Sequence, residues 1–331
     1  MKNLRRRSRA EILKILFSLF SSKDRVLITI DPDPDSIASA MALKRLLWHR
    51  VQTTTIGIIR PIKRLNNLTL VRLLRIPLTL IKPKDLSDYD KYLLVDAQPG
   101  HNELFQDIDF TVVIDHHPVG ALPNVPFVDI RPDYGATATI MTEYLKAAKI
   151  KPSITLATAL IYGIKTDTHN FEQHCLEEDV KAFHSLFSEA NHNIIRKVEI
   201  SDLTIKDLNF FEEALRAKHV VKDRIYTHLH RVPSHDILVI IAEFLLKIHD
   251  ISWSIVSGIQ GSNLIIVVRN DGYRKDAGRT LTKAFGDIGS AGGHKAMARA
   301  EIPLKNLDKL ITRRTPIAIE QFIKKRMTPY S

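Results

Sequence analysis

The sequence predicts an α/β protein, with a doubly wound, mainly parallel sheet in the N-terminal part and a smaller C-terminal α/β domain. Two observations support this. Short apolar runs recur along the first half of the chain, and acidic or histidine-containing motifs follow where these runs end. In an open α/β sheet the carboxyl ends of the strands meet at one crevice, so such motifs converge there. The length of 331 residues exceeds the usual size of one hydrophobic core, which predicts two domains.

Four segments are expected along the chain. They are an amphipathic basic helix at residues 1–21, a metal-binding domain at 22–185, a helical linker at 186–223 and a substrate-binding domain at 224–331. The apolar positions of the first segment follow helical spacing, which favours packing on the first domain over membrane binding. These positions are Ile12, Leu13, Leu16, Phe17 and Phe20. No later run approaches membrane-spanning length, so no membrane partner is expected.

Composition limits the chemistry of any site. The formal charge is +11, from 48 basic and 37 acidic residues, which favours anionic partners such as nucleotides, oligonucleotides or polyphosphate. A single cysteine, Cys175, excludes an intramolecular disulfide and any multi-cysteine zinc or iron-sulfur site. This fits a reducing, cytoplasmic location. Metal ligands must therefore come from Asp, Glu and His.

The first motif follows the apolar run Val26 to Ile30 and contains Asp31, Asp33 and Asp35. Prolines between the aspartates restrict the turn, and residues 36–45 are predicted to form a helix. These carboxylates can supply oxygen ligands to a metal ion. The alternative is that Asp35 or the next residue only caps the helix, and that the other aspartates are turn residues.

Two further motifs each carry one carboxylate. Asp96 follows the apolar run Tyr92 to Val95, and Asp167 lies beyond the run Ala159 to Ile164. The second run is too short for its periodicity to distinguish strand from helix. Either aspartate alone is commonly a turn or cap residue. Asp96 and Asp167 become candidate metal ligands because they occur in order with the other motifs.

The triplet Asp115-His116-His117 closes the apolar run Phe110 to Ile114. Two adjacent imidazoles after a buried strand offer a metal ligand and a group able to contact phosphate, while the carboxylate can orient one ring. The alternative is a polar turn with two surface histidines.

Carboxylate and imidazole ligands without thiolates favour manganese, or magnesium as a weaker alternative, over structural zinc. Two such ions about 3.5 to 4 Å apart can activate a water and stabilise the leaving oxygen of a phosphoryl displacement. The combined motifs therefore indicate hydrolysis of a phosphoester.

The chain resembles the DHH phosphoesterase family, which is named for a triplet matching Asp115-His116-His117. Residues 32–39 and 135–140 are also similar to segments of that family. The run Gly289 to His294 resembles the glycine-rich histidine motif of the DHH-associated domain. That domain accompanies nanoRNases, phosphoadenosine-phosphate phosphatases, cyclic dinucleotide phosphodiesterases and single-strand exonucleases. The resemblance covers nearly the whole chain after about residue 22.

The resemblance implies a site with two divalent ions, Mn²⁺ or alternatively Mg²⁺. It implies the following ligands: Asp33 for one ion, Asp35 for the other, Asp96 as a bridge, and His116 with Asp167 to complete the coordination. His117 would lie near substrate phosphate, and Asp115 would orient the histidines; these two are the predicted catalytic residues. Many nanoRNase-like members have a histidine ligand where this chain has Thr29. We favour substitution by Asp31, and the alternative is a weakened first metal site.

The second half predicts a phosphate clamp. Residues 252–260 and 263–269 are predicted to pair as strands joined at Gly261-Ser262, and residues 280–285 to form a helix before a glycine-rich turn. Glycines let backbone N–H groups approach an anion. The predicted substrate contacts are Arg269, Gly292, Gly293 and His294. The alternative is a solvated basic loop followed by an ordinary flexible turn.

The predicted function is manganese-dependent hydrolysis of short 5′-phosphorylated oligonucleotides, with phosphatase activity on 3′-phosphoadenosine 5′-phosphate as an extension. One alternative is a cyclic dinucleotide phosphodiesterase. Another is a nucleotide-binding protein that has lost catalysis, motivated by Thr29 and by Ala291 within the glycine run. Pyrophosphatase activity is less favoured because the glycine-rich motif belongs to the other branch of the family. The sequence leaves substrate length and homodimer formation open.

Overall fold

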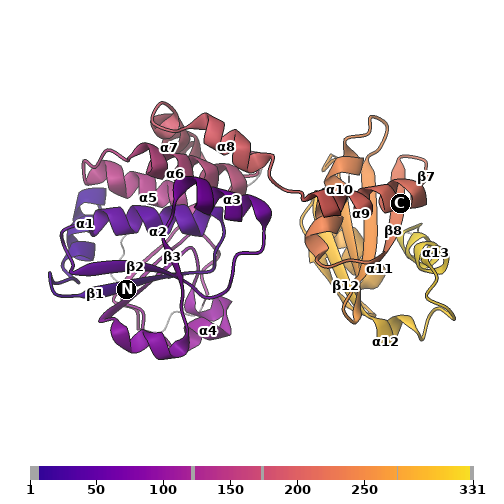
Figure 1. Ribbon diagram of the computed structural model, residues 1–331, viewed down its shortest axis with the longest axis horizontal. Helices are drawn as coiled ribbons and strands as arrows, with labels where there is room; N and C mark the ends of the chain where they lie inside the picture. The colour runs from indigo at the N-terminus through magenta and orange to yellow at the C-terminus, as the bar shows by residue number, and fades with distance from the viewer. Residues whose placement is uncertain (1–6, 121–123, 173–174, 274, 329–331) are drawn as a thin grey trace. The chain divides into compact units, whose positions relative to one another are not determined.

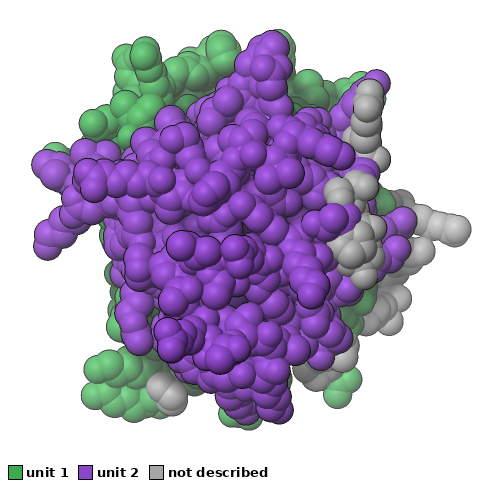
Figure 2. All heavy atoms as spheres, turned by 90° about the vertical axis from the view of Figure 1, so that its right-hand side faces the viewer, with its two compact units in different colours: residues 1–202 green, residues 203–331 purple. Residues whose placement is uncertain are grey.

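The computed structural model describes residues 7–120, 124–172, 175–273 and 275–328. The chain forms two compact units, Met1–Asp202 (unit 1) and Leu203–Ser331 (unit 2). Figure 1 traces the elements of each unit, and Figure 2 colours unit 2 purple. The helices of the described part include none long and apolar enough to cross a membrane.

Unit 1 is built on a six-stranded parallel sheet of order β3-β2-β1-β4-β5-β6. Its strands are β1 (Arg25–Ile30), β2 (Thr53–Ile58), β3 (Leu78–Leu80), β4 (Lys91–Val95), β5 (Val112–Asp115) and β6 (Phe127–Ile130). The strand order reverses between β1 and β4, and this is where ligands bind in doubly wound sheets. The predicted α/β fold class is confirmed.

Helices cover both faces of this sheet. They are α1 (Arg9–Phe17), α2 (Pro34–Leu46), α3 (Leu65–Leu74), α4 (Glu103–Gln106), α5 (Thr137–Ala147), α6 (Ile154–Asp167), α7 (Glu177–Phe187) and α8 (His192–Glu199), with short 3-10 turns η2 (Pro83–Asp88) and η3 (Pro99–His101). Figure 1 shows α4 on the opposite side of the sheet from α2, α5 and α6. Side chains alternate accordingly: Leu93 and Val95 enter the larger core, whereas Leu94 packs with Phe105 of α4.

The N-terminal helix packs on unit 1. Ile12, Leu13 and Leu16 of α1 are buried in its larger core, and Ser8 and Glu11 form a capping box at its start. The expected packing of this segment is thus observed for Arg9–Phe17. The basic part before residue 7 lies outside the described residues.

Unit 2 contains a mixed sheet of order β11-β12-β10-β9-β8-β7, in which only the β8–β9 pair is parallel among the described strands. Its elements are η4 (Ile205–Asp207), α9 (Leu208–Ala217), β7 (His219–Val221), β8 (Arg224–Arg231), α10 (His235–Leu246), β9 (Trp253–Gln260), β10 (Asn263–Asn270), α11 (Ala277–Phe285), β11 (Ser290–Gly293), β12 (Met297–Pro303), α12 (Leu304–Leu307) and α13 (Pro316–Met327). Helices α9 and α10 cover one face, and α11 and α13 cover the other. The predicted hairpin of β9 and β10 is confirmed.

Two sequence predictions need correction. The segment 186–223 is not a separate linker, because Ile195 and Val198 of α8 are buried in unit 1 whereas Ala214 of α9 is buried in unit 2. The boundary therefore falls after Asp202 rather than at 185 and 224. Each of these amphipathic helices packs against the core of a different unit, and the spacing of its apolar residues did not show which unit that would be.

The prediction of a glycine-rich turn is also wrong, because Ser290–Gly293 forms strand β11, which pairs with β12. Gly293 has φ +151°, and a Cβ there would lie 2.3 Å from the carbonyl oxygen of Met297. A Cβ on Gly278 of α11 would lie 2.4 Å from the carbonyl oxygen of Gly293. The glycines thus let a strand and a helix approach closely, which is a second use of glycine besides turns.

The buried imidazole of His228 on β8 makes the stability of unit 2 depend on pH. Burial, with a smaller contribution from His230, lowers the pKa of His228 to about 4. The unfolded value is about 6.5, so stability is fully present above pH 6.5 and is lost as pH falls toward 4. We expect unit 2 to lose about 2 kcal/mol between pH 7 and pH 5 from this group.

Urea unfolding monitored by the buried Trp253, in a Trp48→Phe background, measures this change. His228→Gln should remove that part of the pH dependence. An unchanged pH dependence in the variant would show that other groups cause it.

Candidate metal centre

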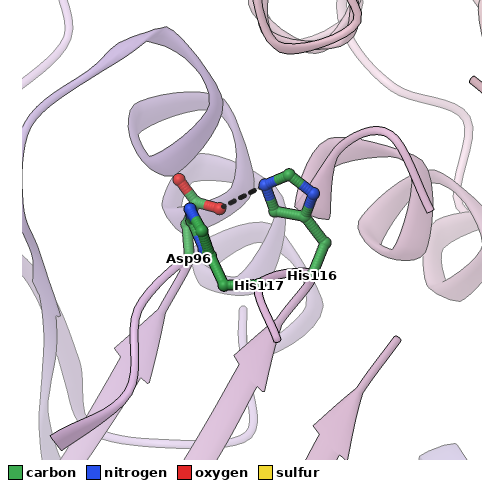
Figure 3. A group of neighbouring side chains, drawn as sticks. All are labelled: Asp96, His116 and His117. Carbon is green, nitrogen blue, oxygen red and sulfur yellow. Dashed lines mark ion pairs between the residues drawn. The ribbon is translucent and has the colours of Figure 1, made fainter. Parts of the chain in front are cut away.

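The acidic motifs meet at the carboxyl ends of β1, β4 and β5, next to the reversal of strand order. Asp33 and Asp35 follow β1, Asp96 follows β4, and His116 follows β5. Asp167 is the last residue of α6. Ligand atoms of Asp35, Asp96, His116 and Asp167 all lie within 4.8 Å of one another. Figure 3 shows two of these side chains, Asp96 and His116, with the neighbouring His117.

Asp35 joins two helices. Asp33 is the N-cap of helix α2, and its Oδ1 accepts a hydrogen bond from the Ser36 amide at 2.8 Å, with Pro34 in the first turn. Asp35, fully buried, turns to the start of α5, where its two oxygens accept hydrogen bonds from Thr137 N at 2.6 Å and Ala138 N at 2.7 Å. The cap residue of α5 is an alanine with no polar side chain, so Asp35 supplies the cap from α2.

A glycine lets α6 approach this carboxylate. Helices α2 and α6 pack together, and a Cβ on Gly163 would lie 3.1 Å from the Asp35 Cα and 3.4 Å from its Oδ1. The same helix carries Asp167 at its C-terminal end. A glycine in a helix interior costs about 0.5–1 kcal/mol relative to alanine, and here it places α6 against the site.

Asp96 adopts a left-handed backbone conformation, with φ +60°. Its amide donates to the Ile114 carbonyl at 2.9 Å, and its Oδ1 accepts from the Thr137 hydroxyl at 2.8 Å. Aspartate tolerates this conformation better than most residues. The backbone thus turns sharply after β4, and the carboxylate faces the N-terminus of α5.

His116 presents one ring nitrogen to the carboxylates. Its Nδ1 lies 3.1 Å from the Tyr134 carbonyl oxygen, so the N–H is placed there. Its Nε2 lies 3.2 Å from Asp167 Oδ2 and 3.6 Å from Asp96 Oδ1. These are ion-pair separations without hydrogen-bond geometry, and the buried Nε2 has no hydrogen-bond partner in the described part of the chain. A ring nitrogen that faces several carboxylates is the arrangement of an imidazole metal ligand, which gives up its proton when an ion binds.

Negative charge is concentrated and poorly solvated here. Burial, followed by repulsion from Asp167, raises the pKa of Asp33 to about 6 and of Asp35 to about 7. Burial and the charge of Asp35 raise the pKa of Asp96 well above its ordinary value. Burial lowers the pKa of His116, but Asp167 and Asp35 outweigh it and raise that pKa to about 9. A divalent cation would relieve this repulsion, and the oxygen and imidazole donors suit one.

Asp115 orients the second histidine. It is fully buried, its Oδ2 accepts from Gln98 Nε2 at 2.6 Å, and its Oδ1 lies 2.8 Å from His117 Nδ1. Burial opposes ionisation of Asp115, yet the hydrogen bonds from His117 and Gln98 outweigh it and lower its pKa. The imidazole of His117 is 44% exposed and lies edge-on to the ring of His101, 5.4 Å away. His101 was not among the predicted site residues, although its position in the loop after Asp96 was a signal.

Asp31 and Asp33 lie outside the described groups of ligand atoms. Asp33 caps α2, and Asp31 forms an ion pair with Arg60, which follows β2. Arg60 was also missed by sequence reasoning, because a basic residue after a strand is common. Thr29 is buried with its hydroxyl unpaired among the described residues. Metal binding by Asp31 and Asp33 stays a prediction.

The predicted phosphate contacts belong to unit 2. Arg269 on β10 is largely buried and pairs with Glu243 at 3.3 Å. His294 follows β11, and its amide donates to the Met297 carbonyl at 2.7 Å. Gly292 faces open space, whereas Gly293 is tightly packed. Phosphate binding by Arg269, Gly292, Gly293 and His294 stays a prediction.

Comparison with known proteins agrees with this geometry. Residues 25–164 match the DHH family, N-terminal domain. This part of the chain is a DHH-family domain. An uncharacterized protein of Methanocaldococcus jannaschii is 35% identical over 280 residues, which are 84% of this chain and 58% of that protein. The chain thus spans under two thirds of that relative's length.

Two solved structures share the fold. An exopolyphosphatase-related protein from Bacteroides fragilis has a TM-score of 0.69 at 16% identity, covering 96% of this chain and 97% of that one. RecJ from Thermus thermophilus, in complex with Mn²⁺, has a TM-score of 0.52 at 17% identity, covering 97% of this chain and 54% of RecJ. These similarities establish a common architecture for a DHH-family domain and the unit that follows it.

Asp96→Asn should separate the destabilising effect of a buried negative charge from its contribution to metal binding. Asparagine keeps the shape and tolerates the left-handed backbone, but it removes one buried negative charge. We expect the metal-free variant to unfold at the same temperature as the wild type or higher. We also expect it to lose most of the stabilisation by Mn²⁺, which amounts to about 2.7 kcal/mol at 100 times Kd.

Thermal unfolding in EDTA and in Mn²⁺ measures both effects. Asp107→Asn, which neutralises an exposed carboxylate of unit 1, serves as the control and should respond to Mn²⁺ like the wild type. Equal Mn²⁺ stabilisation of wild type and Asp96→Asn would rule Asp96 out as a ligand.

Proposed function

We propose that the chain is a metal-dependent phosphoesterase that hydrolyses short 5′-phosphorylated oligonucleotides. The observation that carries this proposal is the buried Nε2 of His116, surrounded by three carboxylates at the strand-order reversal of a DHH-family domain. Phosphatase activity on 3′-phosphoadenosine 5′-phosphate is proposed as an extension, because its phosphomonoesters, like the phosphodiester of an oligonucleotide, are cleaved by attack of water on phosphorus.

The residues suited to hold divalent ions are Asp35, Asp96, His116 and Asp167. Asp33 is proposed as a further ligand through the carboxylate oxygen that does not accept the Ser36 N–H. When bound, such ions activate water and offset charge on the phosphoryl oxygens. Mn²⁺ is favoured over Mg²⁺ because one donor is an imidazole nitrogen. The presence of Mn²⁺ in the T. thermophilus RecJ structure agrees with this preference.

Asp115 and His117 act on the substrate side of the site. His117 Nδ1 lies against Asp115 Oδ1 on a ring that solvent reaches, and a ring nitrogen of His117 lies within 4.8 Å of ligand atoms of Asp96 and His116. The hydrogen bond with Asp115 raises the pKa of His117, and the protonated ring, fixed in this way, can donate its Nε2–H to a phosphate oxygen without searching among rotamers. Gln98 stabilises the arrangement, since its amide oxygen also accepts the Gly120 N–H at 2.7 Å.

The substrate class follows from charge and from the second unit. The chain has a formal charge of +11, which favours a polyanion. Unit 2 contributes Arg269, Gly292, Gly293 and His294 as the proposed phosphate contacts. Linear oligonucleotides are favoured over pyrophosphate because the segment Gly289 to His294 resembles the DHH-associated motif.

The test is release of mononucleotides from a 5′-phosphorylated RNA dinucleotide. We expect turnover with Mn²⁺, none in EDTA, and a loss of at least about 100-fold in kcat for Asp96→Asn. A cyclic dinucleotide and pyrophosphate serve as competing substrates. Faster hydrolysis of either would reassign the substrate, and tight nucleotide binding without any turnover would identify a binding protein.

Asp115→Asn should distinguish a positioning residue from a metal ligand. The amide no longer holds His117 as a charged acceptor does, so we expect kcat to fall by about 10–100-fold. Mn²⁺ affinity, measured by calorimetry, should stay within about threefold of the wild type because all four clustered ligands remain. Loss of metal affinity with unchanged kcat at saturating Mn²⁺ would contradict the assignment.

A further inference from the structure

Unit 2 contains a cavity of about 930 Å³ that none of the predicted site residues lines. It lies between α11, α13 and the segment that joins α12 to α13. Its lining residues are Lys283, Ala284, Leu310, Ile311, Thr312, Arg313, Ala318, Gln321, Phe322, Lys325 and Arg326. The volume is in the range of ligand pockets in proteins. The cavity is therefore large enough to hold part of a nucleotide chain.

The cavity wall is positively charged. It includes Lys283, Arg313, Lys325 and Arg326, and none of the lining residues is acidic. Unit 2 as a whole is also basic, with 21 Lys and Arg against 13 Asp and Glu in residues 203–331. Such a wall attracts an anionic ligand and repels a cationic one.

Ion pairing distinguishes two of the lining cations from their sequence neighbours. Arg314 pairs with Asp308, and Lys324 pairs with Glu320 at 2.5 Å. Arg313 and Lys325, one position away in each case, form no ion pair with another described residue. The positive charges of Arg313 and Lys325 thus remain uncompensated at the cavity.

An aromatic ring and a fixed guanidinium complete the cavity. Arg326 Nη1 donates to the Ala284 carbonyl at 2.9 Å and to Asp287 Oδ1 at 2.6 Å. Its guanidinium carbon lies 5.6 Å from the ring centroid of Phe322, which is partly exposed. A ring beside cations is the combination that single-stranded nucleic acids use, with bases stacked on the ring and phosphates held by the charges.

We propose that this cavity binds single-stranded nucleic acid, with Arg313 and Lys325 contacting phosphates and Phe322 stacking on a base. A duplex is excluded as the preferred ligand because its bases are paired and cannot reach the ring. The site requires no metal and shares no residue with the proposed substrate contacts. It therefore does not rest on the proposed hydrolytic function.

Fluorescence anisotropy of a labelled 12-nucleotide single-stranded RNA, with the full chain in EDTA, tests the proposal. The double variant Arg313→Ala/Lys325→Ala should bind at least about tenfold more weakly than the wild type. The slope of log affinity against log salt should fall by about 1.4, or about 0.7 for each lost phosphate contact. Phe322→Leu should weaken binding at least about threefold while the circular dichroism spectrum stays unchanged.

The matched control is Arg314→Ala/Lys324→Ala. It removes the same net charge from the same two segments, but at ion-paired positions outside the cavity. We expect its affinity to stay within about threefold of the wild type. Equal effects of the two double variants, no effect of the first, or equally tight binding of a duplex would overturn the proposal.

The outcome is also separable from that of the hydrolysis experiment. Asp96→Asn should bind the RNA in EDTA as the wild type does, because this cavity lies in unit 2. A protein without turnover can therefore still bind the strand, and a protein without strand binding can still hydrolyse a dinucleotide. Binding of single-stranded DNA as tight as that of RNA supports the phosphate-and-stacking mode, since the 2′-hydroxyl takes no part in it.

Discussion

The carboxylate of Asp35 is the point on which the architecture of the site depends. It is fully buried, it belongs to the first turn of α2, and it caps α5 by accepting two backbone N–H bonds. Gly163 lets α6 approach the same carboxylate. Three helices are thus positioned by one side chain. Because α5 also carries Thr137 and α6 ends at Asp167, the interactions that assemble the fold here also assemble the ligand set.

These contacts do not compensate the burial of charge by themselves. A hydrogen bond to a charged group contributes about 1.5–3 kcal/mol, whereas burying an ion costs several kcal/mol. The pKa of Asp35 remains raised to about 7 despite its two amide donors, and that of Asp96 is also raised well above its ordinary value. The site is therefore stable as a neutral or cation-bound cluster and strained when all of its carboxylates are charged. Under the proposed function, relief of this strain would favour binding of a divalent ion.

The sequence was sufficient to predict the parallel sheet and the proximity of Asp35, Asp96 and His116, since these three residues follow apolar strands and parallel strands end together. It could not identify α6 as a helix, because that segment is buried on all sides and lacks an amphipathic period. The sequence also could not predict the contacts of Arg60 with Asp31 and of His101 with His117, because Arg60 and His101 lie apart from the recognised motifs. The glycines of β11 were mistaken for a turn because composition does not separate a turn from close packing.

The two units differ in charge in a way that separates binding from chemistry. Residues 1–202 carry 27 basic and 24 acidic residues, and their buried crevice gathers carboxylates, whereas residues 203–331 carry an excess of eight positive charges. A phosphate is repelled by the crevice until cations occupy it, but it is attracted to unit 2 without any metal. Under the proposed function, metal ions would therefore control hydrolysis more strongly than they control capture of a polyanion. Since the basic surface is open to screening by salt and the buried carboxylates are not, ionic strength should act on capture and metal concentration on the chemical step.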